Sequence, residues 1–377
     1  MAVYVDVSAA VHRRAGLGRY AESLVRALAL QIPDRLALFY NREHGITPLD
    51  GVERFPSATV SLGYKPWRMA VWMGQLARVS LHRLLPGATL YHATEHLLMP
   101  LKGIPTVLTI HDLIPQLLPQ HHKPLNRWYL RWTMPLYCRR ADRVIAVSEA
   151  TRRDLAQLYD LPLSKISVIH EAAAPHFEPT SPELQAEARA RHGLPERYLL
   201  YVGTIEPRKN LERLLRVWDP LYRAGEVPPL VLVGKRGWLA DGFYAALESL
   251  PARDGVCLTG YVSDADLPAI YGAATAFVFP SLYEGFGLPP LEAMACGTPV
   301  VCSTAPSLEE VVGGAALCVE AEDDVGLGEA IRRVSSDSAL REDLRARGLA
   351  RAAGFSWARA ARETLDVYDH VLSNTLG

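Results

Sequence analysis

The sequence predicts an α/β protein with two domains, each built around a parallel sheet. Short apolar runs alternate with amphipathic helical patterns along the chain, which is the order of successive βαβ units. This alternation pauses at one proline-rich stretch and then restarts. The chain of 377 residues also exceeds the size at which a single hydrophobic core keeps growing, so two domains of ordinary size are expected.

The predicted strands are the apolar runs that a polar or glycine-bearing turn follows. In the first domain these runs are 3–7, 89–92, 106–110 and 143–147. In the second domain they are 198–202, 230–233, 256–258, 276–279 and 299–302. Ligands of open α/β sheets bind beyond the carboxyl ends of the strands, so the turns after these runs are the expected binding segments.

The domain boundary is predicted near Pro175. Residues 172–195 contain four prolines around an alanine-rich, charged segment, which is typical of a linker with one short helix. We therefore predict an amino-terminal domain at 1–175 and a carboxy-terminal domain at 176–355. The final segment carries an apolar stripe at helical spacing with Ser356 as its cap, so 356–377 is expected to form a helix that is a candidate to pack back on the first domain.

The charge of the two halves is opposite. The net charge is only −1, but residues 1–175 hold 21 Lys and Arg against 13 Asp and Glu, and the remaining residues hold 19 against 28. A basic first half either favours anionic partners, such as a phosphorylated lipid carrier or an anionic membrane surface, or is a solvated basic face.

The cysteines and the hydropathy pattern bear on the compartment. The five cysteines include no CxxC pair, which predicts a reducing compartment and no zinc site. No uncharged apolar stretch reaches 18 residues, and the first residues lack the order of a signal peptide. We therefore expect a cytoplasmic protein that is either soluble or peripheral at the inner face of the plasma membrane.

Residues 65–85 mix aromatic and methionine side chains with Lys and Arg, and the same mixture continues at 127–140. This pattern fits an amphipathic helix at a membrane interface, or a helix that packs in the core. Aromatic and basic interleaving also occurs in nucleic-acid-binding proteins, but no known binding module accompanies it here, so no nucleic-acid partner is predicted.

The stretch YEGFGLPPLEAMACGTPVV, residues 283–301, places two carboxylates around a turn. We predict a turn at 281–288 and a helix that begins at Pro289 and Pro290. Glu284 lies in the turn with few local donors, so it is suited to accept hydrogen bonds from ligand hydroxyls. Glu292 is expected in the first helical turn, where it either caps the helix or projects towards a ligand.

Other turns that follow predicted strands carry polar groups as well. Arg208 and Lys209 lie where a helix begins, which suits phosphate binding or two solvated cations. His111 and Asp112 follow the strand 106–110, and His111 is either a ligand contact or a structural histidine. Residues 91–96 end another strand and are expected to border a second substrate, without assigned roles.

Two short motifs are weak signals. Gly16 and Gly18 precede an apolar helix, and a GxG motif alone proves little. Asp264 and Asp266 imitate a DxD metal-binding motif. Because Ser263 and Asp264 precede apolar residues at helical spacing, they are interpreted as a helix cap and an acidic first turn, and no metal site is predicted.

The stretch EGFGLPPLEAMACGTPVV resembles the glutamate, seven residues, glutamate signature of the retaining group 1 (family 4) glycosyltransferases. This resemblance implies the GT-B fold, with two Rossmann-like parallel-sheet domains facing across a cleft and a nucleotide sugar held mainly by the carboxy-terminal domain. The segments GKRGW (234–238) and HDLIP (111–115) look most like bacterial mannosyltransferases of surface polysaccharide synthesis. They imply GDP-mannose as the donor and a saccharide or lipid-linked saccharide as the acceptor.

The resemblance also implies a role for each matching residue. Glu284 would hydrogen-bond the donor sugar, Glu292 the ribose hydroxyls, and Arg208 and Lys209 the diphosphate. Backbone groups would approach the sugar and diphosphate at Gly285, Phe286, Gly287 and Leu288, and the base at Val262. His111 would contact a sugar hydroxyl with its ring fixed by Asp112, and Gly16 and Gly18 would approach the diphosphate and the acceptor.

The implied reaction is hexosyl transfer with retention, without a metal or any other cofactor. Retention would proceed by front-face substitution, because no second carboxylate is available to pair with Glu284 as in retaining glycosidases. A phosphorylase or sugar-nucleotide epimerase on the same architecture, and a noncatalytic sugar-nucleotide-binding subunit, are the alternatives. One segment departs from the family pattern, since residues 170–174 read HEAAA where relatives carry an Asn-Gly-Val-Asp type loop.

Overall fold

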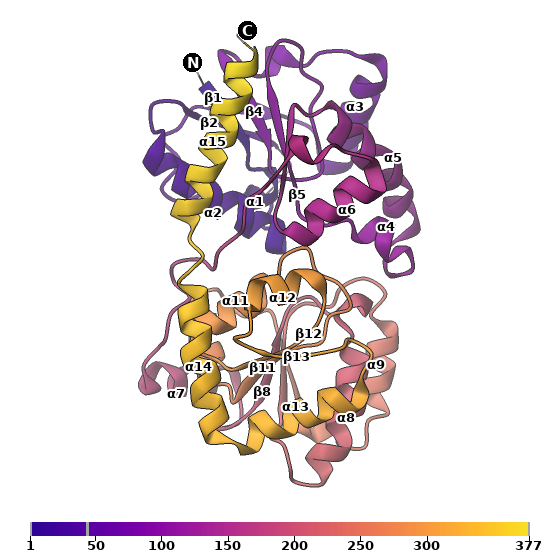
Figure 1. The fold of residues 1–377 in the computed structure, drawn as a ribbon, viewed down its shortest axis with the longest axis vertical. Coiled ribbons are helices and arrows are strands. Elements are labelled where there is room, and N and C mark those ends of the chain that lie inside the picture. Colours follow the sequence, from indigo (N-terminus) through magenta and orange to yellow (C-terminus); the bar gives the residue numbers. More distant parts are fainter. Residues whose placement is uncertain (1, 43–44, 376–377) are drawn as a thin grey trace. The chain divides into compact units, whose positions relative to one another are not determined.

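The computed structural model describes residues 2–42 and 45–375, which form two compact α/β units (Figure 1). Unit 1 comprises Met1–Leu113, Trp128–Glu171 and Ser356–Gly377. Unit 2 comprises Ile114–Arg127 and Ala172–Phe355. Each unit contains one parallel sheet, so the predicted fold class is confirmed.

Unit 1 contains a seven-stranded sheet with the strand order β3-β2-β1-β4-β5-β6-β7. Its strands are β1 (Ala2–Asp6), β2 (Leu36–Asn41), β3 (Ser57–Val60), β4 (Ala88–Ala93), β5 (Thr106–Ile110), β6 (Arg143–Ala146) and β7 (Ile166–Val168). The four predicted strands of this domain are β1, β4, β5 and β6. The expectation missed the other three strands, two of which, β3 and β7, lie at the edges of the sheet.

The helices of unit 1 lie on both faces of this sheet (Figure 1). They are α1 (Ser8–Val11), α2 (Ala15–Gln31), α3 (Tyr64–Ala77), α5 (Pro124–Arg140), α6 (Glu149–Tyr159) and α15 (Trp357–Thr375), and the first turn of α5 belongs to unit 2. The predicted terminal helix is α15, which packs against α2. Ser356 Oγ accepts a hydrogen bond from the Arg359 amide at 3.2 Å, and the Tyr368 hydroxyl lies 2.7 Å from His92 Nδ1.

Unit 2 contains a six-stranded sheet with the order β10-β9-β8-β11-β12-β13. Its strands are β8 (Leu199–Val202), β9 (Leu230–Val233), β10 (Val256–Gly260), β11 (Ala276–Phe279), β12 (Val300–Ser303) and β13 (Leu317–Val319). The five predicted strands are present, and β13 was not predicted. Numbered within the unit, the order is 3-2-1-4-5-6, which is the doubly wound order of nucleotide-binding folds.

In unit 2, the helices α8 (Leu211–Arg223), α9 (Asp241–Glu248), α10 (Leu267–Ala273), α11 (Leu288–Ala295) and α12 (Pro306–Val312) connect consecutive strands of the sheet (Figure 1). The unit also contains α4 (Ile114–Leu117), α7 (Pro182–His192), α13 (Asp324–Ser336) and α14 (Ser338–Ala352). Of these, α7 is the short helix predicted for the linker. Ser181 Oγ caps it by accepting a hydrogen bond from Leu184, and Gly193 ends it at φ 62°.

Large aromatic side chains of the unit 2 core pack at the ends of β8 and β11. Trp218, Tyr201, Phe277 and Phe279 are fully buried, and the rings of Tyr201 and Phe279 are stacked with centroids 5.8 Å apart. Burial of such side chains stabilises the fold by about 1.5–3 kcal/mol each. The loops that follow β8 and β11 therefore start from fixed positions.

The segment at 65–85 has two different faces. Trp67 and Val71 of α3 are buried, as the core interpretation expects, whereas Met69, Met73 and Leu76 are 46%, 57% and 55% exposed. None of the helices in the described ranges is both long enough and apolar enough to cross a membrane.

Candidate functional site

The strand order places the best candidate site of unit 2 beyond β8 and β11. The chain reverses its direction of progress between these neighbouring strands, and such switch points are where open α/β sheets bind ligands. The loop 203–210 follows β8 and the loop 280–287 follows β11. Asn210 Nδ2 donates to the Pro280 carbonyl at 3.1 Å, and the Leu282 amide donates to the Arg208 carbonyl at 2.8 Å, so the two loops are joined.

A cluster of charges links these loops. Arg208 Nη1 lies 2.8 Å from Glu284 Oε1, and Lys209 Nζ lies 2.5 Å from the same oxygen. Arg208 Nη2 also pairs with Glu206 Oε1 at 2.8 Å. The side chains of Lys209 and Glu284 are 7% and 9% exposed, so the ion pairs are shielded from water.

The cluster fixes the charge of Glu284. Burial alone would raise its pKa, but the charges and hydrogen bonds of Arg208 and Lys209 dominate and lower the pKa to about 2. Burial and the neighbouring Arg208 charge lower the pKa of Lys209, and Glu284 opposes this effect. Glu284 is therefore ionised at neutral pH, which suits an acceptor of hydrogen bonds and not a proton donor.

Glu284 receives its donors from a distant part of the sequence and not from its own turn. Arg208 and Lys209 are 76 and 75 residues away in sequence, but β8 pairs with β11 and brings them against the carboxylate. The predicted residues Arg208, Lys209 and Glu284 are thus gathered in one place. Glu206 completes the cluster and was not predicted, although it stands only two residues before Arg208 in the sequence.

Glu292 does not lie in the first turn of its helix, where it was expected. The helix α11 begins at Leu288 and not at the proline pair, so Glu292 is its fifth residue and lies in the second turn. Its side chain is 1% exposed, and its Oε2 accepts a hydrogen bond from the Tyr271 hydroxyl at 3.1 Å. The capping interpretation is therefore wrong, and the expected ribose contact stays a prediction.

The glycine turn before α11 is held by its neighbours. Ser307 Oγ donates to the Glu284 carbonyl at 2.6 Å. Gly287 has φ 120°, and a Cβ at this position would lie 2.6 Å from Leu308 Cδ2, so a larger residue would be strained. Between them, Phe286 is buried and its ring packs edge-on against Phe355 at 5.9 Å.

The loop after β10 contains the predicted base contact and the DxD motif. Val262 is buried in the core of unit 2, while the ring of the neighbouring Tyr261 is 62% exposed with Lys235 Nζ 4.5 Å from its centroid. The helix α10 begins at Leu267 with Asp266 as its N-cap residue, so the predicted cap at Ser263 is wrong. Asp266 pairs with Arg191 and with His192, the latter at 3.0 Å. Within residues 2–42 and 45–375, no three His, Cys, Asp or Glu side chains are grouped as metal ligands.

In unit 1, His111 lies at the end of β5 with both ring nitrogens engaged. Nδ1 lies 3.0 Å from Glu171 Oε1, and Nε2 lies 2.9 Å from the Thr94 carbonyl. Burial would lower the pKa of His111, but Glu171, the Thr94 carbonyl and Asp112 together raise it. The prediction that Asp112 fixes the ring is therefore corrected: Glu171 and Thr94 hold it, and the expected sugar contact would require one of these bonds to be exchanged.

Gly16 and Gly18 lie inside α2 and not in a loop before it. The helix begins at Ala15, which makes the motif part of its first two turns. Gly16 is exposed, and a Cβ there would meet nothing within 4 Å, whereas a Cβ on Gly18 would lie 2.9 Å from the Ala9 carbonyl oxygen. Gly18 is thus needed for the packing of α2 on α1, and Gly16 keeps its expected role as a prediction.

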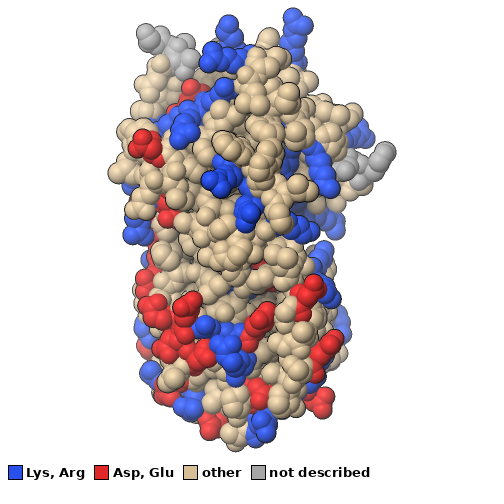
Figure 2. Space-filling view, turned by 90° about the vertical axis from the view of Figure 1, so that its right-hand side faces the viewer, with Lys and Arg blue, Asp and Glu red and all other residues tan. Residues whose placement is uncertain are grey.

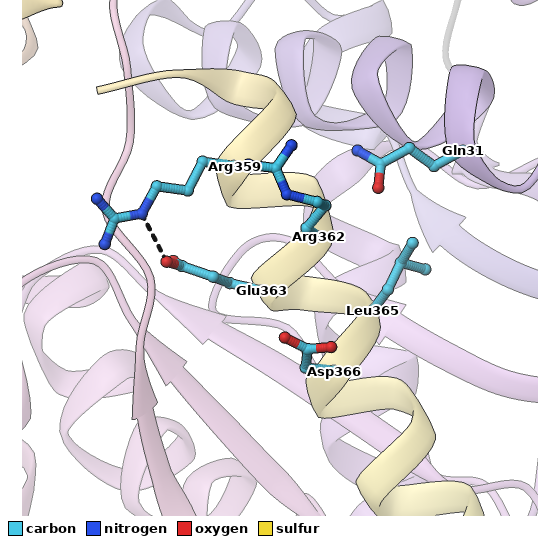
Figure 3. Close-up of a pocket in the computed structure, with 6 residues that line it drawn as sticks. All are labelled: Gln31, Arg359, Arg362, Glu363, Leu365 and Asp366. Atoms are coloured by element: carbon cyan, nitrogen blue, oxygen red, sulfur yellow. Dashed lines mark hydrogen bonds and ion pairs between the residues drawn. The ribbon is translucent and has the colours of Figure 1, made fainter. Parts of the chain in front are cut away.

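A hollow on unit 1 is separate from these residues. It has a volume of about 440 Å³ and lies between Gln31, the last residue of α2, and the charged side chains of α15 (Figure 3). Arg359 and Glu363 form an ion pair of 2.7 Å beside it. The predicted residues of unit 1 lie at the opposite, amino-terminal end of α2, so this hollow is not the candidate site.

The comparisons with known proteins agree with this geometry. The family Glycosyltransferase Family 4 matches residues 14–175, and the family Glycosyl transferases group 1 matches residues 185–351. O-antigen chain mannosyltransferase B of Escherichia coli is 33% identical over 94% of this chain and 95% of its own. The chain belongs to the group 1 glycosyltransferases.

A second mannosyltransferase and a solved structure are also similar to this glycosyltransferase. The serotype-specific mannosyltransferase WbdA of Escherichia coli is 31% identical over 74% of this chain and 35% of its own length. The structure of Anabaena HepE in complex with UDP and glucose covers 98% of this chain and 99% of its own, with a TM-score of 0.76 and 19% identity. The glycosyltransferase therefore has the GT-B fold, as the sequence resemblance implied.

Proposed function

We propose that this glycosyltransferase transfers mannose from GDP-mannose to a hydroxyl of a saccharide or lipid-linked saccharide in surface polysaccharide synthesis. The reaction would retain the anomeric configuration and use neither a metal nor another cofactor. The relatives named as mannosyltransferases support the sugar. The observation that carries the proposal is the buried cluster of Glu284, Arg208 and Lys209 at the switch point of unit 2.

Donor binding at this cluster would exchange partners. Without donor, Glu284 and Glu206 neutralise Arg208 and Lys209. A nucleoside diphosphate sugar offers the cations a diphosphate in place of Glu284 and offers Glu284 the hydroxyls of its sugar. Charge-assisted hydrogen bonds of both kinds are stronger than neutral ones, so after the exchange the cations are paired with the diphosphate and Glu284 is hydrogen-bonded to the sugar.

The same cations would act on the leaving group. As the bond from the anomeric carbon to the diphosphate oxygen breaks, negative charge grows on that oxygen close to Arg208 and Lys209. The acceptor oxygen bonds to the anomeric carbon on the same face, and its proton passes to the departing phosphate oxygen. A preorganised donor of this kind contributes about 3–4 kcal/mol to such a transition state. No protein base is required, because the departing phosphate oxygen takes the proton.

The test of this proposal is a donor and product assay with the full chain. A thermal-shift screen with UDP, GDP and ADP sugars identifies the donor, and a GDP sugar is expected to stabilise the enzyme most. NMR of the first product formed gives its anomeric configuration, which is expected to match that of the donor. Transfer should persist in EDTA. An inverted product, or activity that EDTA abolishes, would contradict the proposal.

We also propose that unit 1 binds an anionic membrane surface through α3 and α5. Met73, Leu76 and Trp132 are more than half exposed, and the rings of Trp72 and Trp128 pack at 5.6 Å, so the two helices present one apolar face. Lys and Arg outnumber the acids over unit 1 on the face seen in Figure 2. An apolar face with a cationic surround is suited to the boundary of anionic lipids.

Vesicle flotation tests this second proposal. The wild-type enzyme is expected to float with vesicles that contain phosphatidylglycerol and to remain unbound with pure phosphatidylcholine. Met73→Glu should abolish flotation while solution transfer to a short acceptor persists. A matched change at Leu30, which is 83% exposed on α2, should leave flotation unchanged. Equal flotation of wild type and Met73→Glu would contradict membrane binding by this face.

A further inference from the structure

Unit 1 has a switch point of its own, between β1 and β4. The chain leaves β1 into the segment 7–14 and enters α2, and it leaves β4 at Thr94 and Glu95. Thr94 Oγ1 donates to the Asp6 carbonyl at 2.6 Å, and Arg14 Nη1 lies 2.8 Å from Glu95 Oε2. The ion pair between Arg14 and Glu95 therefore spans the position where this second sheet is expected to bind a ligand.

Glu95 is a buried acid with an unused oxygen. The residue is 2% exposed, and its Oε2 is bonded to Arg14. Within the described ranges of the chain, its Oε1 has no hydrogen-bond partner. A buried acceptor without a donor costs about 1–3 kcal/mol, so a carboxylate that only supported the fold would be expected to have both oxygens bonded.

The neighbouring Asp6 shows what a structural acid looks like at this edge. It is 1% exposed, and both of its oxygens are used: Oδ1 accepts from the Ser8 amide at 2.8 Å and Oδ2 accepts from the Tyr91 hydroxyl at 2.9 Å. Burial raises the pKa of both Asp6 and Glu95. Of these two buried acids, Glu95 is thus the one with an unused oxygen.

Arg14 is less buried than Glu95. Its side chain is 23% exposed, against 3% for Glu95, and its guanidinium lies 3.4 Å from the centre of the Tyr64 ring. Arg68 lies over the same ring at 5.0 Å. Arg14 therefore orients the carboxylate of Glu95 from a position that is partly open to solvent and supported by the Tyr64 ring.

We propose that Glu95 Oε1 binds a hydroxyl group of the acceptor saccharide, with Arg14 as the residue that positions the carboxylate. A hydroxyl is the ligand that the site favours, because a carboxylate oxygen can only accept a hydrogen bond and a hydroxyl donates one, whereas an ionised phosphate would compete with Glu95 for Arg14. Thr94, the residue before Glu95, accepts a hydrogen bond from His111, so the site adjoins that imidazole. The inference rests on the proposed function for the class of acceptor.

The test measures acceptor binding without donor. Saturation-transfer NMR with octyl mannoside, glucoside and N-acetylglucosaminide identifies the glycoside that the wild-type enzyme binds, and its Kd is then compared among variants. Glu95→Gln removes the charge and keeps the shape, and roughly tenfold to hundredfold weaker binding is expected from the loss of a hydrogen bond to a charged group. The affinity for GDP should change less than twofold.

Glu95→Asp provides a second variant should the amide disturb folding. It keeps the charge but withdraws the oxygen by one methylene, so glycoside binding should again weaken while GDP binding persists. Unchanged glycoside affinity in either folded variant, or an equal loss of GDP and glycoside affinity, would overturn the inference. If wild type binds a glycoside but does not use GDP-mannose, the proposed donor is wrong and the inference about Glu95 still stands.

Discussion

Replacement of Glu284 by Gln separates the two jobs that we assign to the charged cluster of unit 2. The substitution removes the negative charge 2.8 Å from Arg208 and 2.5 Å from Lys209 and keeps an oxygen that accepts hydrogen bonds. Loss of one partner of a buried ion pair costs about 3–5 kcal/mol, and the retained oxygen favours the lower figure. At 2–4 °C per kcal/mol for a unit of this size, the Tm is expected to fall by roughly 6–12 °C.

Activity and nucleotide binding should respond in opposite directions. The donor sugar loses a charged acceptor, so kcat/KM for transfer is expected to fall by about a hundredfold or more. In the variant, Arg208 and Lys209 are no longer neutralised by a carboxylate at position 284. The diphosphate of GDP should therefore bind the variant at least as tightly as wild type. Steady-state transfer assays and calorimetric titration with GDP measure the two effects.

Glu206→Gln is the matched control, because Glu206 pairs with the same Arg208 at 2.8 Å. It removes the same charge from the same cluster but takes no acceptor from the turn that is expected to hold the sugar. It should also strengthen GDP binding, with a much smaller loss of transfer. Equal losses of transfer in the two variants would refute the assignment of Glu284 to the sugar.

Two further predictions concern unit 1. Glu171→Gln removes the main cause of the raised pKa of His111, whose ordinary value is 6.5. Protonated His111 stabilises the fold below that pH, and this contribution is lost as the pH rises through the raised value. Urea unfolding should therefore show a loss of about 2 kcal/mol at pH 6 and a smaller loss at pH 9; equal losses would contradict the role of Glu171. Gly16→Ala places a methyl group in open space within α2, so stability should stay the same or rise by about 0.5–1 kcal/mol while the KM of a substrate rises; an unchanged KM would exclude close approach by a substrate.

The strands that the sequence predicts are those with a continuous buried apolar run. The strand β11 is found where it was expected because Ala276–Phe279 are all buried. The strand β3 lies at an edge, and its residues alternate between exposed and half-buried, so Ser57–Val60 carries little apolar signal. The strand β2 is different: Leu36–Phe39 are buried and apolar, so the sequence does carry a strand signal at these residues.

The site residues divide in a similar way. Arg208, Lys209 and Glu284 were identified from their turns, but their mutual pairing depends on β8 lying beside β11, and a strand order cannot be derived from separate turns. Glu171 pairs with His111 from 60 residues away and stands in the segment that departs from the family pattern. That departure was the available signal for it. Glu95 stands in a turn that was noted without a role, because its unused oxygen is visible only when the surrounding donors are counted.

The environment, and not the residue type, decides what each buried glutamate of this enzyme can do. Glu284 touches two cations, which lower its pKa to about 2, so it is charged at neutral pH and can accept hydrogen bonds from the hydroxyls of a sugar. Glu95 touches one cation, and burial raises its pKa, so a neutral donor such as a hydroxyl is the partner that relieves its unused oxygen. This division suits a glycosyl transfer, since the cations beside Glu284 can bind the diphosphate of the donor and Glu95 can bind an alcohol of the acceptor. Because both residues are glutamates, their different roles can come only from the side chains that surround them.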